Sequence, residues 1–239
     1  MRIAIVSDIH GNGAAFEAVL RDLRDVAPDF VLHGGDLADG GSCPAEVVDR
    51  VHDLGWPGVL GNTDEMLVRP DSLDKFAGAR PALAPLFDAV REMAAFTREA
   101  LGEARLRWLR GQPHVHLEDA LALVHATPSN LWQAPEPEAA GAELESAYAL
   151  LGRSLVVYGH IHRPHIREMA GFTLANTGSA GLPLDGDPRA SYLLIENGRP
   201  AIRRVEYDVE SEIARLRDSR LPHAEWAARM LAAARAEMP

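Results

Sequence analysis

The first part of the chain alternates short apolar runs with segments of helical periodicity. Residues 3–6 are continuously apolar, as expected for a strand that is buried on both faces. After Gly11, apolar residues recur every three or four positions as far as Leu23, and a second apolar run follows at residues 30–32. This order of strand, helix and strand predicts a βαβ unit.

A second helix follows the βαβ unit. Pro44 begins this helix at a position where the missing N–H of proline costs little, and Gly55 ends it. Residues 59–60 are expected to form a third short strand. From residue 66 to residue 112 the alternation stops, and apolar positions keep helical spacing. We predict a helical insertion there, which either caps a neighbouring site or packs as a helical pair on the edge of the sheet.

The second half of the chain is richer in strands that pair through short turns. Strands are expected at residues 114–117, 120–124, 155–158, 165–169, 172–175, 191–195 and 201–205, and helices at residues 136–151, 209–217 and 222–236. No internal repeat, low-complexity tract or linker divides the chain. We therefore expect residues 1–239 to form a single α/β domain that contains the 66–112 insertion.

Composition narrows the range of partners. The formal net charge of −11 and the lack of a basic run argue against a long nucleic acid. The single cysteine, Cys43, excludes an internal disulfide and fits a reducing compartment. The first apolar run is too short for a signal peptide, and no segment has the length of a transmembrane helix. We expect a cytoplasmic protein with no membrane partner; the sequence leaves its oligomeric state open.

Metal-binding side chains stand at the ends of predicted strands. They are Asp8, His10, Asp36, Asn62, His125, His160 and His162. Taken singly, Asp36 is a plausible turn residue and His125 a plausible core histidine. In open α/β sheets, however, the carboxyl ends of strands converge, and all seven residues occupy such positions. Carboxylate, amide and imidazole groups together suit divalent metals, so the sequence predicts a two-metal centre.

The motifs that contain these residues resemble those of the calcineurin-like metallophosphoesterase superfamily. That family has Asp-x-His, Gly-Asp, Gly-Asn-x-Asp/Glu, a lone His after a strand and Gly-His-x-His, and all five occur here in order. Residues 176–183 are similar to a segment of its small bacterial and archaeal phosphodiesterase-like branch. The resemblance covers nearly the whole chain. It implies a four-layer α-β-β-α sandwich with two central mixed β-sheets.

The resemblance also implies how the ligands are shared. One metal would be held by Asp8, His10, Asp36 and His162, and the other by Asp36, Asn62, His125 and His160. A bridging carboxylate such as that of Asp36 can hold two cations about 3.5 to 4 Å apart. A bridging hydroxide formed from water between them would be the nucleophile. Manganese is the expected metal, with iron, zinc, nickel, cobalt and magnesium as alternatives.

One departure from the family pattern concerns the proton supply. Many relatives have a His directly after the motif Asn, thought to protonate the leaving group, and here Thr63 takes that place. Asp64 is either a general acid with a raised pKa or a group that orients its neighbours. Arg163 either holds a substrate phosphate or is a surface arginine. The predicted catalytic residues are Asp36, Asn62, Asp64 and His125, and the predicted substrate contacts are Asn62 and Arg163.

The predicted function is that of a metal-dependent phosphoric ester hydrolase acting on small phosphodiesters or nucleotide polyphosphates. Metal charge offsets the carboxylates of Asp8 and Asp36, and more distant acidic groups are screened, so a phosphate can dock. A phosphomonoesterase, including a protein phosphatase, is the alternative within the same class, and a lipid-precursor pyrophosphatase is a further one. A non-catalytic metal-binding interaction module would be expected to lack a ligand, and none of the seven is missing.

Overall fold

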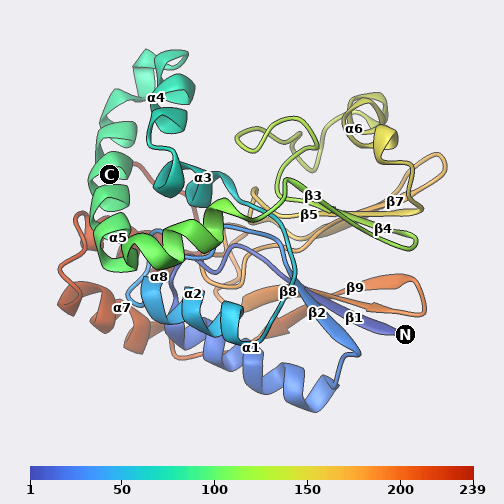
Figure 1. Cartoon of the computed structure of the whole chain (residues 1–239), viewed down its shortest axis with the longest axis horizontal. Coiled ribbons are helices and arrows are strands. Elements are labelled where there is room, and N and C mark those ends of the chain that lie inside the picture. Colours follow the sequence, from blue (N-terminus) through green and yellow to red (C-terminus); the bar gives the residue numbers. More distant parts are fainter.

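Two mixed β-sheets pack face to face at the centre of the molecule, and helices cover the outer face of each sheet (Figure 1). The computed structural model describes residues 1–239. The strand order is β2-β1-β8-β9 in the first sheet and β3-β4-β5-β7-β6 in the second. The four-layer sandwich that the sequence motifs implied is confirmed.

The first sheet contains both parallel and antiparallel pairs. Its strands are β1 (Arg2–Val6), β2 (Phe30–His33), β8 (Ala190–Glu196) and β9 (Arg199–Val205). β1 pairs in parallel with β2 and antiparallel with β8, and β8 and β9 form a hairpin. Helix α1 (Gly13–Val26) connects β1 to β2 as the predicted βαβ unit requires, and the Asn12 side chain caps it by accepting the Ala15 N–H at 2.9 Å.

The second sheet has three parallel strands at its centre. Its strands are β3 (Val115–Glu118), β4 (Leu121–Val124), β5 (Leu155–Tyr158), β6 (His165–Glu168) and β7 (Thr173–Asn176). β4, β5 and β7 run in parallel, and β3 and β6 are antiparallel edges. Helix α6 (Gly141–Tyr148) and the 3₁₀ turn η2 (Ala149–Leu151) follow β4, and Leu144 and Tyr148 of α6 pack on the outer face of this sheet.

The side chains of β1 alternate between two cores. Ile3 and Ile5 pack between the two sheets, whereas Ala4 and Val6 face the helical layer that includes α1 and α2 (Pro44–Asp53). This alternation is the period-two pattern of a strand buried on both faces. Each large apolar side chain buried in this way contributes about 1.5 to 3 kcal/mol to stability.

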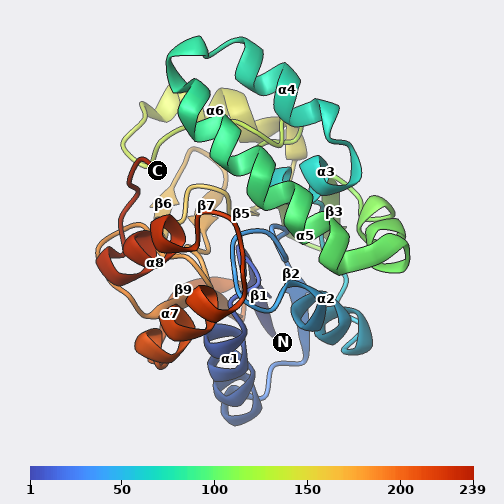
Figure 2. The same cartoon turned by 90° about the vertical axis from the view of Figure 1, so that its left-hand side faces the viewer.

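The helical insertion lies at the end of the sheets where β1 finishes, opposite the N-terminus (Figure 1). The predicted range 66–112 begins inside α3 (Asn62–Val68) and includes α4 (Asp71–Gly78), the 3₁₀ turn η1 (Pro81–Leu83) and α5 (Ala84–Arg110). The backbone of Gly102, at φ 66° and ψ 171°, breaks α5 before its last turns. In Figure 2, α5 crosses in front of the central strands.

The insertion also packs against the C-terminal helices α7 (Val209–Asp218) and α8 (Ala224–Ala233). Ala89 and Met93 of α5 join Trp226 and Met230 of α8 in one apolar cluster. None of the helices combines the length and the apolar composition that a membrane-spanning helix requires.

The third strand predicted in the first half of the chain is wrong. Residues 59–60 form no strand, and only Gly58 pairs with His33, in an isolated bridge. The Leu60 N–H donates to the carbonyl of Pro113 at 2.8 Å instead. The chain leaves the sheet there because α3 begins at Asn62.

Two predicted helices are shorter than expected. The helix predicted at residues 136–151 begins only at Gly141. Pro137 disfavours a helical conformation in Glu136, and the carbonyls of Pro137 and Ala139 accept hydrogen bonds from Arg167. The helix predicted at residues 222–236 is limited to Ala224–Ala233, because His223 and Ala234 adopt left-handed conformations at φ 57° and 48°. Apolar periodicity alone did not mark these ends.

Candidate metal centre

All seven predicted ligands converge near the carboxyl ends of the strands, and Asn62 reaches this place from the first turn of α3 rather than from a strand. Five of them have a left-handed backbone, with φ of 55° at Asp8, 50° at His10, 54° at Asp36, 67° at His160 and 54° at His162. This conformation costs roughly 1 to 2 kcal/mol in a residue other than glycine. Such strain concentrates at functional sites, where the surrounding structure maintains it.

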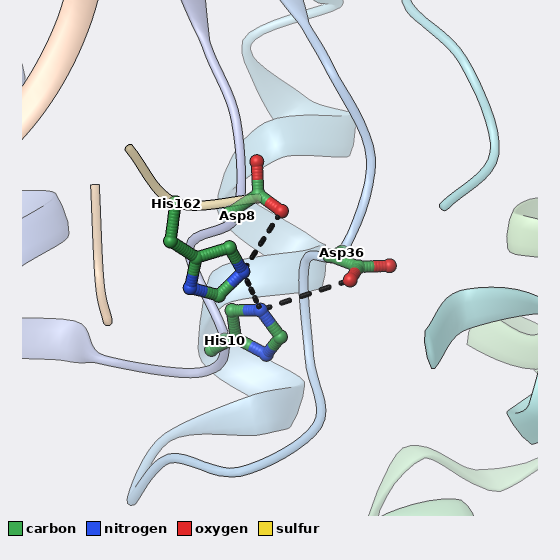
Figure 3. Close-up of side chains that lie close together, drawn as sticks. All are labelled: Asp8, His10, Asp36 and His162. Carbon is green, nitrogen blue, oxygen red and sulfur yellow. Dashed lines mark hydrogen bonds and ion pairs between the residues drawn. The ribbon is translucent and has the colours of Figure 1, made fainter. Parts of the chain in front are cut away.

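Four ligands form the first group, shown in Figure 3. One donor atom from each of Asp8, His10, Asp36 and His162 lies within 4.8 Å of all the others, and all four residues are buried. The Nε2 atom of His162 lies 3.2 Å from Oδ1 of Asp8 and 3.2 Å from Nε2 of His10. The Nε2 atom of His10 lies 3.7 Å from Oδ2 of Asp36. Mixed nitrogen and oxygen donors in one small buried space fit a divalent cation.

Backbone carbonyls orient the two imidazoles of this group. Nδ1 of His10 lies 2.7 Å from the carbonyl oxygen of Asp39, and Nδ1 of His162 lies 2.6 Å from that of Leu182. Because a carbonyl oxygen only accepts, Nδ1 carries the proton in both rings and Nε2 faces inward. A hydrogen bond from the outer ring nitrogen is the usual support of a metal-binding histidine.

The remaining ligands form a second group next to the first. Oδ1 of Asn62 lies 2.9 Å from Nε2 of His125 and 2.8 Å from Nδ1 of His160. Nε2 of His125 also lies 3.4 Å from Oδ2 of Asp36, the same oxygen that faces His10. Nδ1 of His125 donates to the carbonyl of Gly34 at 2.8 Å. Asp36 is therefore adjacent to both groups.

Charge is distributed unevenly among these ligands. Burial alone would raise the pKa of Asp36, but the imidazoles of His125 and His10 hold it well below its usual range. Burial acts to lower the pKa of His125, and Asp36 outweighs it and raises this pKa to about 10. In the same way Asp8 raises the pKa of His162 against the effect of burial. Without metal, the protonated imidazole of His125 therefore offsets the charge of Asp36, and Asp8 favours the protonated form of His162.

The other two histidines of the centre are neutral near pH 7. Burial and the charge of His162 lower the pKa of His10. Burial and the charge of His125 lower the pKa of His160 to about 4. These two rings are ready to donate a lone pair without losing a proton.

Asp64 is fixed by the backbone. Its Oδ2 accepts the N–H groups of Asp36 at 2.8 Å and Gly61 at 3.1 Å, and its Oδ1 accepts the N–H of Leu37 at 3.0 Å. Burial and the charge of Asp36 raise its pKa to about 7. The N–H of Thr63 donates to Oδ1 of Asp36 at 2.9 Å, whereas the buried Thr63 hydroxyl has no partner. This geometry favours the orienting role among the alternatives for Asp64.

Arg163 lies beside the centre and is already engaged. Its guanidinium forms two hydrogen bonds with Glu138, at 2.5 and 3.3 Å, and lies 3.4 Å from Glu136. The side chain is 40% exposed. The charge of Arg163, the predicted substrate contact, is thus offset by Glu136 and Glu138 in the segment that follows β4.

Two supporting residues were not identified from the sequence. Asp39 orients His10 through its carbonyl, and burial raises the pKa of its own carboxyl to about 7. The Ser179 hydroxyl donates to the backbone carbonyl of Asp8 at 2.6 Å. Ser179 lies in the segment 176–183 that the motif comparison had marked, whereas the role of Asp39 depends on its backbone, which no motif records.

Comparison with known proteins identifies the family of this chain. The family model of the calcineurin-like phosphoesterase superfamily domain matches residues 1–198. The chain belongs to this superfamily. The crystal structure of a metallophosphoesterase from Sphaerobacter thermophilus superposes with a TM-score of 0.78 at 27% identity, over 98% of this chain and 100% of that one.

The chain also resembles two proteins in sequence. The uncharacterized protein MJ0912 of Methanocaldococcus jannaschii is 28% identical over 94% of each chain. The symmetrical bis(5'-nucleosyl)-tetraphosphatase of Methylococcus capsulatus is 32% identical over 62% of this chain and 51% of that protein. The chain is thus a phosphoesterase, and its buried cluster of Asp8, His10, Asp36 and His162 could hold a metal ion.

Proposed function

We propose that this phosphoesterase uses a dinuclear metal centre to hydrolyse small phosphodiesters or nucleotide polyphosphates. The observation that carries the proposal is the shared oxygen of Asp36, which faces His10 of the first ligand group and His125 of the second. Two divalent cations, when bound, supply an activated water and stabilise the charge that develops on the phosphoryl oxygens. Manganese is the metal we would test first.

The side chains have distinct roles in this proposal. Asp36 would help to hold both metals, and each of the remaining ligands would hold one. The amide oxygen of Asn62 faces His125 and His160, which leaves its Nδ2 free to donate to a substrate oxygen. Asp64 holds the segment Asp36-Leu37 after β2, here called the Asp36 loop, against α3 by accepting its two backbone N–H groups, and it also accepts the N–H of Gly61, the cap of α3. Its contribution is therefore positional.

The substrate class is inferred from the proton supply. Thr63 stands where a histidine could protonate a leaving group, and both oxygens of Asp64 accept backbone N–H groups. A leaving group that is stable as an anion, such as a nucleotide phosphate, needs least help from an acid. The similarity to the bis(5'-nucleosyl)-tetraphosphatase also supports small nucleotide polyphosphates as substrates.

Turnover of bis-nitrophenyl phosphate in manganese tests the proposal. We expect Asp36→Asn and His160→Ala to abolish turnover while the circular dichroism of the protein stays unchanged. His52→Asn is the control, because the His52 side chain is 59% exposed and outside the centre. Full activity of Asp36→Asn would refute the proposal.

A panel of substrates then separates the reaction classes. It contains monoesters, diesters, cyclic nucleotides and dinucleoside polyphosphates, each assayed with the manganese-loaded protein. Activity restricted to monoesters would establish the phosphomonoesterase alternative. Activity on diesters or dinucleoside polyphosphates is the expected result.

A further inference from the structure

Residues 127–140, here called the 127–140 loop, leave the centre directly after His125. The loop starts with a tight turn, in which the Thr127 N–H donates to the carbonyl of Asn130 at 3.0 Å and the Asn130 N–H donates to the Thr127 hydroxyl at 3.1 Å. The Trp132 N–H then donates to Oδ1 of Asn130 at 2.8 Å. These bonds make the stretch from His125 to Trp132 a short and well-braced connection.

The far end of the loop is tied to the second sheet. Arg167 of β6 donates from Nη1 to the carbonyls of Pro137 at 2.9 Å and Ala139 at 2.8 Å. Arg163 pairs with Glu138, as described above. Two arginines thus hold residues 137–139 beside the strand that follows His160 and His162.

The near end of the loop is tied to the insertion. The indole Nε1–H of Trp132 donates to Oε2 of Glu65 in α3 at 2.6 Å, and the Glu65 side chain is only 15% exposed. The Trp132 ring lies on Phe76 of α4, with centroids 4.9 Å apart and planes at 32°. A hydrogen bond to an ionised carboxylate in a poorly exposed place is among the stronger ones in proteins.

The two residues of this bond stand close to two proposed ligands of the second metal. Glu65 follows Asn62 by three positions on α3 and so lies on the same side of the helix. Trp132 follows His125 through the braced turn. Asp64 fixes α3 relative to the Asp36 loop, which belongs to the first sheet. Two hydrogen-bond contacts join α3 to the segment that follows β4 of the second sheet. One is between Asn62 and His125, and the other is between Glu65 and Trp132.

We propose that Glu65 and Trp132 are positioning residues for the second metal, because they hold Asn62 and His125 at the spacing needed to bind the same ion. This inference rests on the proposed dinuclear centre. The side chain of Asn62 has no hydrogen-bond partners other than His125 and His160, so its distance from them depends on where α3 lies. The insertion then takes part in forming the metal site, in addition to packing beside it.

Calorimetric titration of the metal-free full-length protein with Mn²⁺ alone tests the proposal. The second metal is identified as the one whose binding is lost in Asn62→Ala. We expect Trp132→Phe and Glu65→Leu to weaken this ion about fivefold, the equilibrium factor typical of one hydrogen bond, and to leave the first ion within about twofold. Glu65→Gln should retain the wild-type affinities, since its amide oxygen still accepts the indole N–H.

Trp226→Phe is the matched control. It also removes an indole N–H hydrogen bond, to the carbonyl of Glu237 at 2.9 Å, but Trp226 belongs to the apolar cluster of α5, α7 and α8, which includes no residue of the loop. Melting of each metal-free variant verifies folding, and Glu65→Leu provides the comparison if Trp132→Phe does not fold. Equal weakening of both ions, or no weakening of the second, would overturn the inference alone. A wild-type protein that binds one ion would overturn the dinuclear proposal as well.

Discussion

Metal uptake should release protons, and the number released follows from the charges of the ligands. Without metal, the pKa of His125 is raised to about 10 and that of His162 lies above the ordinary value of about 6.5. A metal-bound imidazole must give up the proton on its donor nitrogen. The pKa values of His10 and His160 are lowered, so these two rings contribute little to the release. At pH 6, filling both sites should release about two protons per chain from His125 and His162, in addition to any that the bound charge displaces from the carboxyls of Asp39 and Asp64.

The affinity for metal should rise with pH. A raised pKa in the metal-free protein means that protons compete with metal below that pKa. The affinity should therefore fall about tenfold per pH unit for each displaced proton, which corresponds to about 1.4 kcal/mol. Titrations with Mn²⁺ at pH 6 in two buffers of different ionisation enthalpy measure the proton number directly.

A matched pair of variants isolates the source of the protons. His125→Asn should release about one proton fewer than the wild type at pH 6, because its amide does not titrate. His52→Asn, which changes an exposed histidine, should release the wild-type number. Metal uptake with no proton release, or an equal decrease in both variants, would refute the charge distribution described here.

Three further predictions concern single residues. Asp64→Asn should lower the stability of the metal-free protein by about 1 to 3 kcal/mol in urea unfolding, because an amide nitrogen cannot accept a backbone N–H; a changed pH–rate profile with full stability would support the general acid instead. In Gly159→Ala the new Cβ would lie 2.4 Å from Oδ2 of Asp8, so Mn²⁺ should bind about tenfold more weakly, whereas Gly78→Ala, which meets nothing within 4 Å, should bind normally. Arg163→Ala should change kcat/KM by less than about threefold, since its charge is already paired, and a much larger rise in KM would identify it as a phosphate contact.

Most of the strands and the candidate ligands could be predicted from the sequence. Buried strands are continuous apolar runs, and parallel strands carry the residues that follow them to a common edge, so the proximity of Asp8 and Asp36 after β1 and β2 follows from local pattern. His160 follows β5 of the second sheet, and its place beside them was implied only by the family resemblance. The identity of the four-layer sandwich came from the motifs themselves. Each strand and each motif consists of a few consecutive residues, so both can be recognised in the sequence.

Features that depend on distant contacts could not be predicted in this way. Residues 59–60 have the composition of a strand, but the Leu60 N–H bonds to Pro113 in the far part of the chain. The alternatives for Arg163 could be weighed only once Glu138 was placed beside it. The bond between Glu65 and Trp132 joins residues 67 positions apart, and neither belongs to a motif.

The central claim is that Asp36 joins two metals in one centre, and electron paramagnetic resonance of the manganese-loaded protein tests it most directly. A bridging carboxylate couples the spins of two Mn²⁺ ions, so the wild type at two equivalents of Mn²⁺ should show the spectrum of a coupled pair. Asp36→Asn should lose this spectrum and retain at most the signal of isolated ions. A wild-type spectrum of isolated ions at full occupancy would contradict the shared centre.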